Sequence, residues 1–307
     1  MSEQSHNPQP SSKPGTETGR KKPTSAWRKF RRHISKTKLR VPHIWLRHRG
    51  ITPTDVFFAS YPRSGTTWSR FTLFEILTGQ EASFHAVNAA VRGVGRHKFG
   101  AHLLPANGRL IATHEQYRTD YKKAIYLVRD VRDVILSEFA YTRALEFFRG
   151  DLDEFLNVFL CGKISGFGPW PRHITSWLNS PIAGTDNMLV MRFEDLRQNP
   201  DEGFSRMADF LGVRVDQERI RRAVANNLLE KMKEKEQAEP QRASVKDRFV
   251  RTGSVQAWRS KLSPAQVQFI EQHAGSLLLR LGYQLASGIS ESAADLNPVL
   301  QSTSSIS

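Results

Sequence analysis

The chain contains only one cysteine, Cys161, among its 307 residues. A single thiol can form neither an internal disulfide framework nor a cysteine-based zinc site, and such scarcity is typical of proteins from reducing compartments. The sequence also lacks a run of about 18 apolar residues, which a membrane-spanning helix needs. Its start, MSEQSHNPQPSSKPG, has no apolar segment of the kind found in a secretory signal. We therefore expect a cytoplasmic protein, with peripheral membrane contact as an alternative.

Acidic residues are scarce in the first 50 positions. This segment holds 13 Lys and Arg against 2 Asp and Glu, whereas the rest of the chain holds 32 against 28. A pI near 10.2 alone would suggest a nucleic-acid-binding protein, but the positive charge belongs mostly to one terminal segment. We expect residues 1–50 to form a basic, largely disordered arm that either packs on the body or touches anionic lipid, without specific nucleic-acid binding.

Four short apolar runs end in polar or turn residues: DVFFASY, RLIATH, AIYLVRD and MLVMRFEDL. Such runs are typical of strands buried on both faces of a parallel sheet. Helical patterns are found at residues 68–77, 133–148, 152–160, 201–211, 216–235 and 265–282. We predict one α/β domain over residues 51–285, with a central parallel sheet flanked by helices and a site at the carboxyl ends of the strands. The polar residues 286–307 are expected to form a flexible tail.

The first apolar run leads into a turn of small and polar residues: Arg63, Ser64, Gly65, Thr66 and Thr67. A helix that begins near Trp68 would direct free N–H groups and the positive end of its dipole at this turn. Glycine allows an oxyanion to approach closely, and the hydroxyls add donors. An ordinary capped turn is the alternative. The stretch lacks the lysine of G-x-x-x-x-G-K-[ST], so we predict an anion cradle that is not a Walker-type P-loop.

Three stretches resemble, in the same order, motifs of the sulfotransferases that use 3′-phosphoadenosine 5′-phosphosulfate. YPRSGTTW is similar to the family's 5′-phosphosulfate loop, usually Y-P-K-S-G-T-T-W. YLVRDVRDVILSEF resembles the 3′-phosphate motif, and FVRTGSVQAWR resembles the loop R-K-G-x-x-G-D-W-K. The three stretches lie within residues 61–259. The resemblance implies a P-loop-kinase-like sulfotransferase fold and sulfuryl transfer to a hydroxyl acceptor without a metal.

The resemblance also implies roles for individual residues. The turn would hold the 5′-phosphosulfate, and Trp68 would stack on adenine. The 3′-phosphate would be held by residues from two motifs: Arg129, Ser137, Arg251, Thr252 and Gly253. Arginine suits this task because its guanidinium can bind phosphate through two hydrogen bonds. Thr252 replaces the lysine usual in the family, so this part of the clamp is expected to be weaker.

Several charges follow the third apolar run. Arg129 taken alone could equally form a salt bridge with Asp130 or Asp133. We predict that Arg132 and Asp133 pair with each other across the start of the next helix. This pairing would be structural and would leave Arg129 to bind the donor.

A general base is needed because an acceptor hydroxyl is a poor nucleophile until its proton is removed. His114 ends the run RLIATH and falls on the family's catalytic histidine, whose usual context is K-T-H-L-P. A histidine with a pKa of about 6.5 is available as a neutral base near pH 7. Ala112 replaces the family's lysine, and Glu115 follows the histidine. Because some branches of the superfamily use glutamate as the base, Glu115 is an alternative to His114, while Arg63 would stabilise charge on the departing phosphate.

Two other functions and several acceptors stay open. A P-loop-like nucleotide kinase is disfavoured by the missing Walker lysine, and a basic-arm protein that binds membrane or nucleic acid would not need the cradle. The acceptor could be a small molecule, a lipid or a carbohydrate. An aromatic wall would favour phenols or lipids, and its candidates are Phe84, His85, Phe99, Tyr141, Phe147, Phe148, Phe167 and Trp170. Cations would instead favour a glycan, and these are Arg92, Arg96, His97 and Lys98.

Overall fold

The computed structural model describes residues 40–239 and 253–286. The chain divides into two units, Met1–Leu46 and Arg47–Ser307. Helix α2 (Arg40–His48) contains the described residues of the first unit. The sheet and the site described below belong to the second unit.

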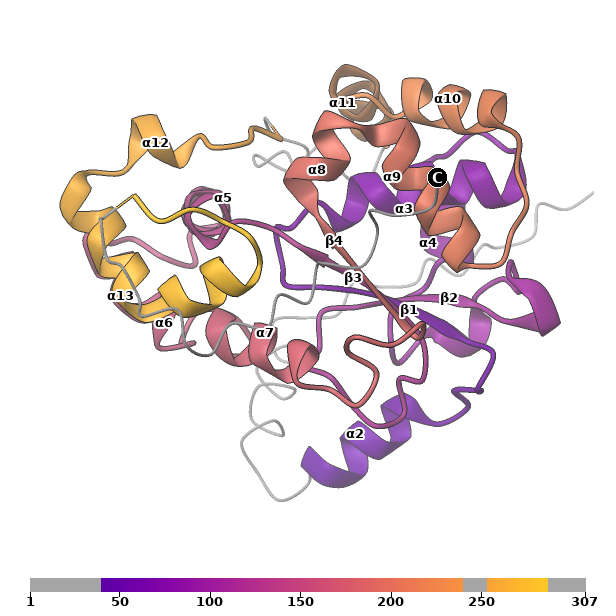
Figure 1. Cartoon of the computed structure of the whole chain (residues 1–307), viewed down its shortest axis with the longest axis horizontal. Coiled ribbons are helices and arrows are strands. Elements are labelled where there is room, and N and C mark those ends of the chain that lie inside the picture. The colour runs from indigo at the N-terminus through magenta and orange to yellow at the C-terminus, as the bar shows by residue number, and fades with distance from the viewer. Residues whose placement is uncertain (1–39, 240–252, 287–307) are drawn as a thin grey trace, which may run out of the picture. The chain divides into compact units, whose positions relative to one another are not determined.

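A parallel sheet of four strands forms the centre of this unit (Figure 1). Its order is β2–β1–β3–β4, and the strands are β1 (Val56–Ser60), β2 (Leu110–Thr113), β3 (Ala124–Val128) and β4 (Met188–Arg192). Phe57 pairs with Ile111 of β2 on one side and with Ala124 of β3 on the other. Both central strands are buried along their whole length, as expected when helices cover both faces. The predicted parallel α/β fold is confirmed.

Helices cover the two faces of the sheet, and each face has its own hydrophobic core (Figure 1). Phe57 and Tyr126 point into one core, beneath α5 (Val131–Ala144), α6 (Leu152–Leu160), α7 (Trp170–Leu178) and α13 (Pro264–Arg280). Phe58 and Leu127 point into the other, with α3 (Thr66–Thr78), α9 (Pro200–Phe210) and α10 (Gln217–Asn226). Adjacent strand residues enter opposite cores because side chains alternate along a strand.

The smaller elements are α4 (Phe84–Ala90), η1 (His97–Phe99), η2 (Pro105–Asn107), α8 (Phe193–Gln198), α11 (Leu229–Gln237) and α12 (Trp258–Lys261). The prediction of one helix over 216–235 is wrong, because α10 ends at Asn226 and α11 begins at Leu229. Between them the buried Asn227 donates its side-chain amide to Glu75 Oε1 at 2.8 Å. The helix predicted at 133–148 ends early, at Ala144, and Glu146 has a left-handed φ of 56°.

Candidate active site

The turn between β1 and α3 forms a cradle at the helix N-terminus, and its members are Arg63, Ser64, Gly65, Thr66 and Thr67. Gly65 is the N-cap and has a φ of 94°, a conformation that favours glycine. A Cβ atom at this position would lie 2.4 Å from Cδ2 of Phe193, so the ring leaves room for glycine alone. Ser64 Oγ is buried and has no hydrogen-bond partner within the described part of the chain. An unpaired hydroxyl at a helix N-terminus is a donor available to an anion.

Arg63 connects the cradle to α5. Its backbone has a φ of 70°, which is uncommon for a residue with a side chain. Its Nε donates to Ser137 Oγ at 3.1 Å, and its guanidinium carbon lies 4.5 Å from the centre of the Tyr141 ring. The fold therefore places residues of the first and second motifs in direct contact.

Arg129, which directly follows β3, joins all three motifs. Its Nη1 donates to the carbonyl of Arg63 at 2.9 Å, and its Nη2 donates to the carbonyl of Ser254 at 2.8 Å. Its Nε is buried without a hydrogen-bond partner among the residues that the structure describes. Gly253 lies next to this contact, with a left-handed φ of 54°. Arg251 and Thr252 lie outside the described residues.

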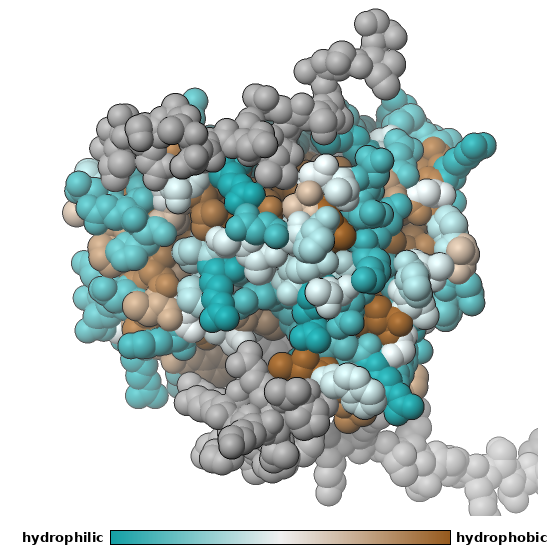
Figure 2. Space-filling view, turned by 60° about the horizontal axis from the view of Figure 1, so that its bottom comes forward, coloured by the Kyte–Doolittle hydropathy of each residue, from teal (hydrophilic) through white to brown (hydrophobic). Residues whose placement is uncertain are grey.

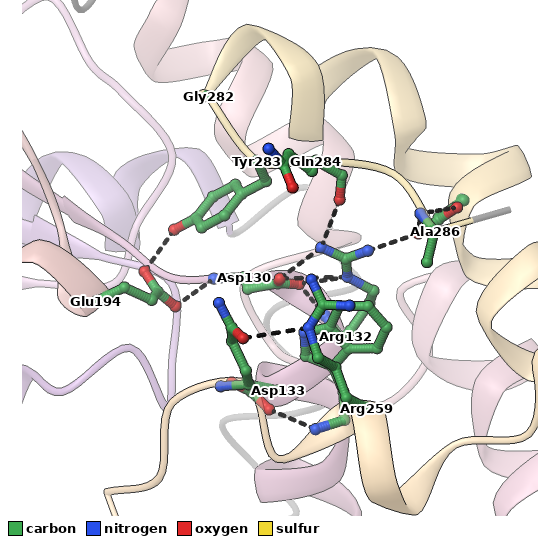
Figure 3. A network of polar contacts seen from close by, with 12 residues as sticks. Asp130, Arg132, Asp133, Glu194, Arg259, Gly282, Tyr283, Gln284 and Ala286 are labelled. Atoms are coloured by element: carbon green, nitrogen blue, oxygen red, sulfur yellow. Dashed lines mark hydrogen bonds and ion pairs between the residues drawn. The ribbon is translucent and has the colours of Figure 1, made fainter. Parts of the chain in front are cut away.

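A polar network holds the third motif against α5 (Figure 3). Asp133 accepts hydrogen bonds from the backbone N–H groups of Gln256 at 2.8 Å and Trp258 at 3.0 Å. The predicted pairing of Arg132 with Asp133 is wrong. Arg132 instead binds Asp130 Oδ2 at 2.7 Å and Glu271 Oε1 of α13 at 2.5 Å, which leaves Asp133 free to hold the loop.

Sequence reasoning missed this role of Asp133. The amides that it binds lie 123 and 125 residues further along the chain, so no local pattern could reveal the contact. Burial is the largest influence on Asp133 and raises the pKa of its carboxyl group, while the nearby Arg129 charge opposes this rise. Asp133 thus lies near Arg129 and holds the loop at residues 256–258.

Trp68 lies next to the cradle in the first turn of α3. Its ring meets Phe193 edge-on at 6.1 Å and Phe204 at 5.4 Å, and the guanidinium of Arg197 lies 5.2 Å from the ring centre. Phe193 also lies 4.7 Å beneath the guanidinium of Arg129. Aromatic rings therefore connect the cradle with Arg129.

A cavity of about 730 Å³ borders the third motif. Its lining includes Arg192, Arg197, Gly253, Trp258 and Tyr283. Cavities of roughly 300–1,000 Å³ are typical of small-molecule and cofactor sites. This cavity is lined by charged side chains, so a polar ligand suits the space beside Gly253.

His114 follows β2 and contacts the cradle through Ser60. Its Nδ1 lies 2.8 Å from the carbonyl oxygen of Ser60, so Nδ1 carries the proton and Nε2 keeps a lone pair. The hydroxyl of Ser60 in turn lies 2.5 Å from that of Thr66. Burial lowers the pKa of His114 and the Arg70 charge adds to this, while the hydrogen bond to Ser60 acts in the opposite sense. The result is a half-buried imidazole whose pKa lies below the ordinary histidine value.

Glu115 points to a different set of partners. Its Oε1 lies 2.9 Å from Arg47 Nη2, and its Oε2 lies 3.0 Å from His48 Nε2. Burial is the largest influence and would raise the pKa of Glu115, but the His48 hydrogen bond and the cations Arg47 and Arg118 hold it below its usual value. A paired carboxylate of lowered pKa is a weak proton acceptor.

The predicted aromatic wall is only partly present. Phe167 lies 5.6 Å from the His114 ring, and Tyr141 lies beneath Arg63. Trp170 is fully buried in the core between the sheet and α13, and Phe84 packs against Phe71, so neither can form an open wall. Both rings instead pack among the buried side chains of hydrophobic cores.

Residues 40–239 and 253–286 contain no group of three or more His, Cys, Asp or Glu side chains arranged to hold a metal ion. Within the same residues, no helix is long and apolar enough to cross a membrane. The face in Figure 2 is mainly hydrophilic, with separate hydrophobic patches.

Comparison with known proteins identifies the class. Residues 53–282 match the family model described as "sulfotransferase domain". This match covers most of the chain, and the chain therefore belongs to the sulfotransferase family. The predicted family and enzyme class are confirmed: the protein is an enzyme that transfers sulfate.

Individual relatives agree with this assignment. Mouse sulfotransferase 1A1 is 26% identical over 250 residues, which cover 74% of this chain and 85% of the relative. Cytosolic sulfotransferase 13 of Arabidopsis thaliana is 23% identical over 251 residues, with 74% and 77% covered. A crystal structure of retinol dehydratase in a complex with retinol and PAP has a TM-score of 0.63 and 21% identity, covering 78% of this chain and 86% of that one. This last likeness shows a shared fold.

Proposed function

We propose that this enzyme transfers the sulfuryl group of 3′-phosphoadenosine 5′-phosphosulfate to a hydroxyl of a small-molecule, lipid or carbohydrate acceptor. One observation carries the proposal. Arg129 donates to backbone carbonyls of both the cradle, at Arg63, and the third motif, at Ser254. The two segments that the resemblance assigns to the donor's phosphates thus meet at one guanidinium, which supports binding of a donor with phosphates at its 5′ and 3′ positions.

The residues fit this donor. The cradle would hold the 5′-phosphosulfate through its N–H groups and hydroxyls, and Trp68 would stack on adenine. The 3′-phosphate would be bound by Arg129, Ser137, Arg251, Thr252 and Gly253. Buried donors that lack a partner among the described residues, Ser64 Oγ and Arg129 Nε, support the fit because such groups gain free energy from an anionic ligand.

His114 is the proposed general base. Its Nε2 would take the proton of the acceptor hydroxyl while that oxygen attacks sulfur, in line with the departing phosphate. A new S–O bond to the acceptor forms as the S–O bond to the phosphate breaks. Arg63 stabilises the charge that grows on the phosphate and acts electrostatically, since a guanidinium has no proton to give near neutral pH. No step of this proposal calls for a metal ion.

The contacts of Glu115 favour His114 as the base. Glu115 is held by Arg47 and His48, whereas His114 is linked to the cradle through Ser60 and has Nε2 as its proton-accepting nitrogen. A general base must reach the acceptor proton, and the link from His114 to the cradle supports His114 for this role.

Substitution of the two candidates tests the assignment. His114→Ala is expected to lower kcat by about 10²- to 10⁴-fold, the usual contribution of a positioned base. Glu115→Ala should leave most of the transfer rate intact. Calorimetric binding of 3′-phosphoadenosine 5′-phosphate serves as the control, since both variants should keep it. If only the glutamate substitution abolishes turnover while nucleotide binding persists, the assignment to His114 is wrong.

We also propose a cytoplasmic location with weak contact between residues 1–50 and anionic membranes. The 13 cations and 2 acids of this arm support the contact. Flotation of the full chain with vesicles of phosphatidylcholine, with and without phosphatidylserine, measures it. Binding should need the anionic lipid and weaken with salt, and equal recovery from both vesicle types would contradict it.

A further inference from the structure

Helix α7 holds the backbone that follows β2 at two adjacent carbonyls. His173 Nε2 lies 3.1 Å from the carbonyl oxygen of His114, and Trp177 Nε1 donates to the carbonyl of Glu115 at 3.0 Å. The two donors stand four residues apart, so both face the same side of the helix. Both side chains are fully buried. The carbonyls thus anchored belong to the two residues that could serve as the base.

The proton positions in this contact follow from its partners. A carbonyl oxygen only accepts, so Nε2 of His173 must carry a hydrogen. The neutral ring then has a lone pair on Nδ1, which lies 3.0 Å from the hydroxyl of Tyr126. Burial, with a further contribution from nearby His114, lowers the pKa of His173 to about 3. His173 is therefore neutral at working pH, and both of its nitrogens are paired in a fully satisfied buried network.

The anchored backbone separates the two candidate bases. His114 and Glu115 follow the end of β2 at Thr113, and their side chains reach different partners. With both carbonyls anchored on α7, the His114 ring reaches Ser60 beside the cradle, while the Glu115 carboxylate reaches Arg47 and His48. A rotation of this short segment would disturb both arrangements together.

We propose that His173 and Trp177 form a positioning clamp on the backbone of His114 and Glu115, and that this clamp presents His114 to the acceptor. The inference rests on the proposed role of His114. His173 is a positioning residue, because it acts through the backbone and does not touch the reacting atoms. Tyr126 fixes the tautomer that the clamp requires.

A purely structural role and a positioning role differ in their effect on the pH profile. Besides burial, the hydrogen bond to Ser60 and the charge of Arg70 influence the pKa of His114. If the clamp is loosened, water reaches the imidazole and the effect of burial shrinks, so the pKa of His114 rises toward its ordinary value. Because the base must be unprotonated, the acidic limb of the kcat profile should then move to higher pH.

Two substitutions of His173 provide the test. His173→Phe keeps a ring but removes the N–H group that binds the His114 carbonyl. It should lower kcat by about 10- to 100-fold, since a small misplacement of a reacting group costs up to about 100-fold in rate. The KM for the sulfuryl donor should change little. His173→Gln can place an amide N–H near the position of Nε2 and should restore most of the rate. His273→Phe is the control, because His273 is an exposed histidine of α13 and lies outside the clamp. It should leave both kcat and the pH profile unchanged.

Histidine NMR titration provides a readout that needs no acceptor. The His114 signal should titrate at higher pH in His173→Phe than in the original protein or in His273→Phe. If sulfuryl transfer is never detected, the proposed function fails. The titration still tests the clamp, because it does not depend on transfer. An unchanged titration and an unchanged kcat in folded His173→Phe would overturn the clamp. If that variant does not fold, Trp177→Phe removes the N–H group that binds the Glu115 carbonyl. The His114 titration must then shift to higher pH in Trp177→Phe, or the inference is wrong.

Discussion

The two sides of the site differ in how completely their buried polar groups are paired. On the donor side, formed by the cradle and Arg129, Ser64 Oγ and Arg129 Nε have no hydrogen-bond partner among the described residues. On the base side, formed by the segment after β2, His114 Nδ1 and the backbone carbonyls of His114 and Glu115 are all hydrogen-bonded. Buried hydrogen-bond donors without a partner cost free energy, so an anion bound at the donor side would stabilise the protein. On the base side, by contrast, the hydrogen bonds that orient His114 are already formed before any ligand binds.

On the donor side, the largest effect is expected from the cation Arg63. Arg63→Ala should lower kcat by on the order of 10²- to 10³-fold, as loss of one group that stabilises developing charge commonly does. Arg63→Lys keeps a cation at this position and should retain most of the activity. Steady-state kinetics at saturating donor measure both. Equal loss in the two variants would mean that shape, and not charge, is what Arg63 contributes.

A smaller effect is expected from the backbone of the cradle. Gly65→Ala would bring a Cβ atom to 2.4 Å from Phe193 in a residue with a φ of 94°, so the cradle must shift. Affinity for 3′-phosphoadenosine 5′-phosphate should fall by roughly 10-fold, or about 1.4 kcal/mol. Gly184→Ala is the matched control, since Gly184 has a φ of 73° and open space around it. Gly184→Ala should lower the stability of the protein without changing its affinity for the nucleotide. If it lowered that affinity as much as Gly65→Ala does, the close contact with Phe193 would not explain the effect at Gly65.

The smallest effect is expected on the base side, in the thermal stability of the protein at acid pH. Burial lowers the pKa values of His114 and His173, in the latter case to about 3. Below the ordinary histidine pKa of about 6.5, the unfolded chain binds protons that the folded chain does not, so stability falls as the pH falls. His173→Gln removes one of these groups and should flatten the decline of Tm between about pH 7 and pH 5 by a few degrees. An identical decline in the variant would contradict the assignment.

Much of the site could be predicted because its signals are local. The cradle directly follows a buried strand, and Arg129 and His114 each follow another, so the parallel sheet brings them to one edge. The burial of Trp170 and the break at Asn227 could not be predicted, because both depend on packing against distant segments. The roles of Asp133 and His173 were missed for the same reason, since each holds a backbone group far away in the chain.

The central claim is transfer of a sulfuryl group from 3′-phosphoadenosine 5′-phosphosulfate. The most direct measurement incubates the full chain with donor labelled in its sulfuryl group and with separate panels of phenols, sugars, lipid alcohols and tyrosine peptides. We predict that label moves to at least one class of hydroxyl acceptor, and that His114→Ala slows this transfer by about 10²- to 10⁴-fold while nucleotide binding persists. Absence of transfer to every class, together with absence of donor binding, would contradict the account.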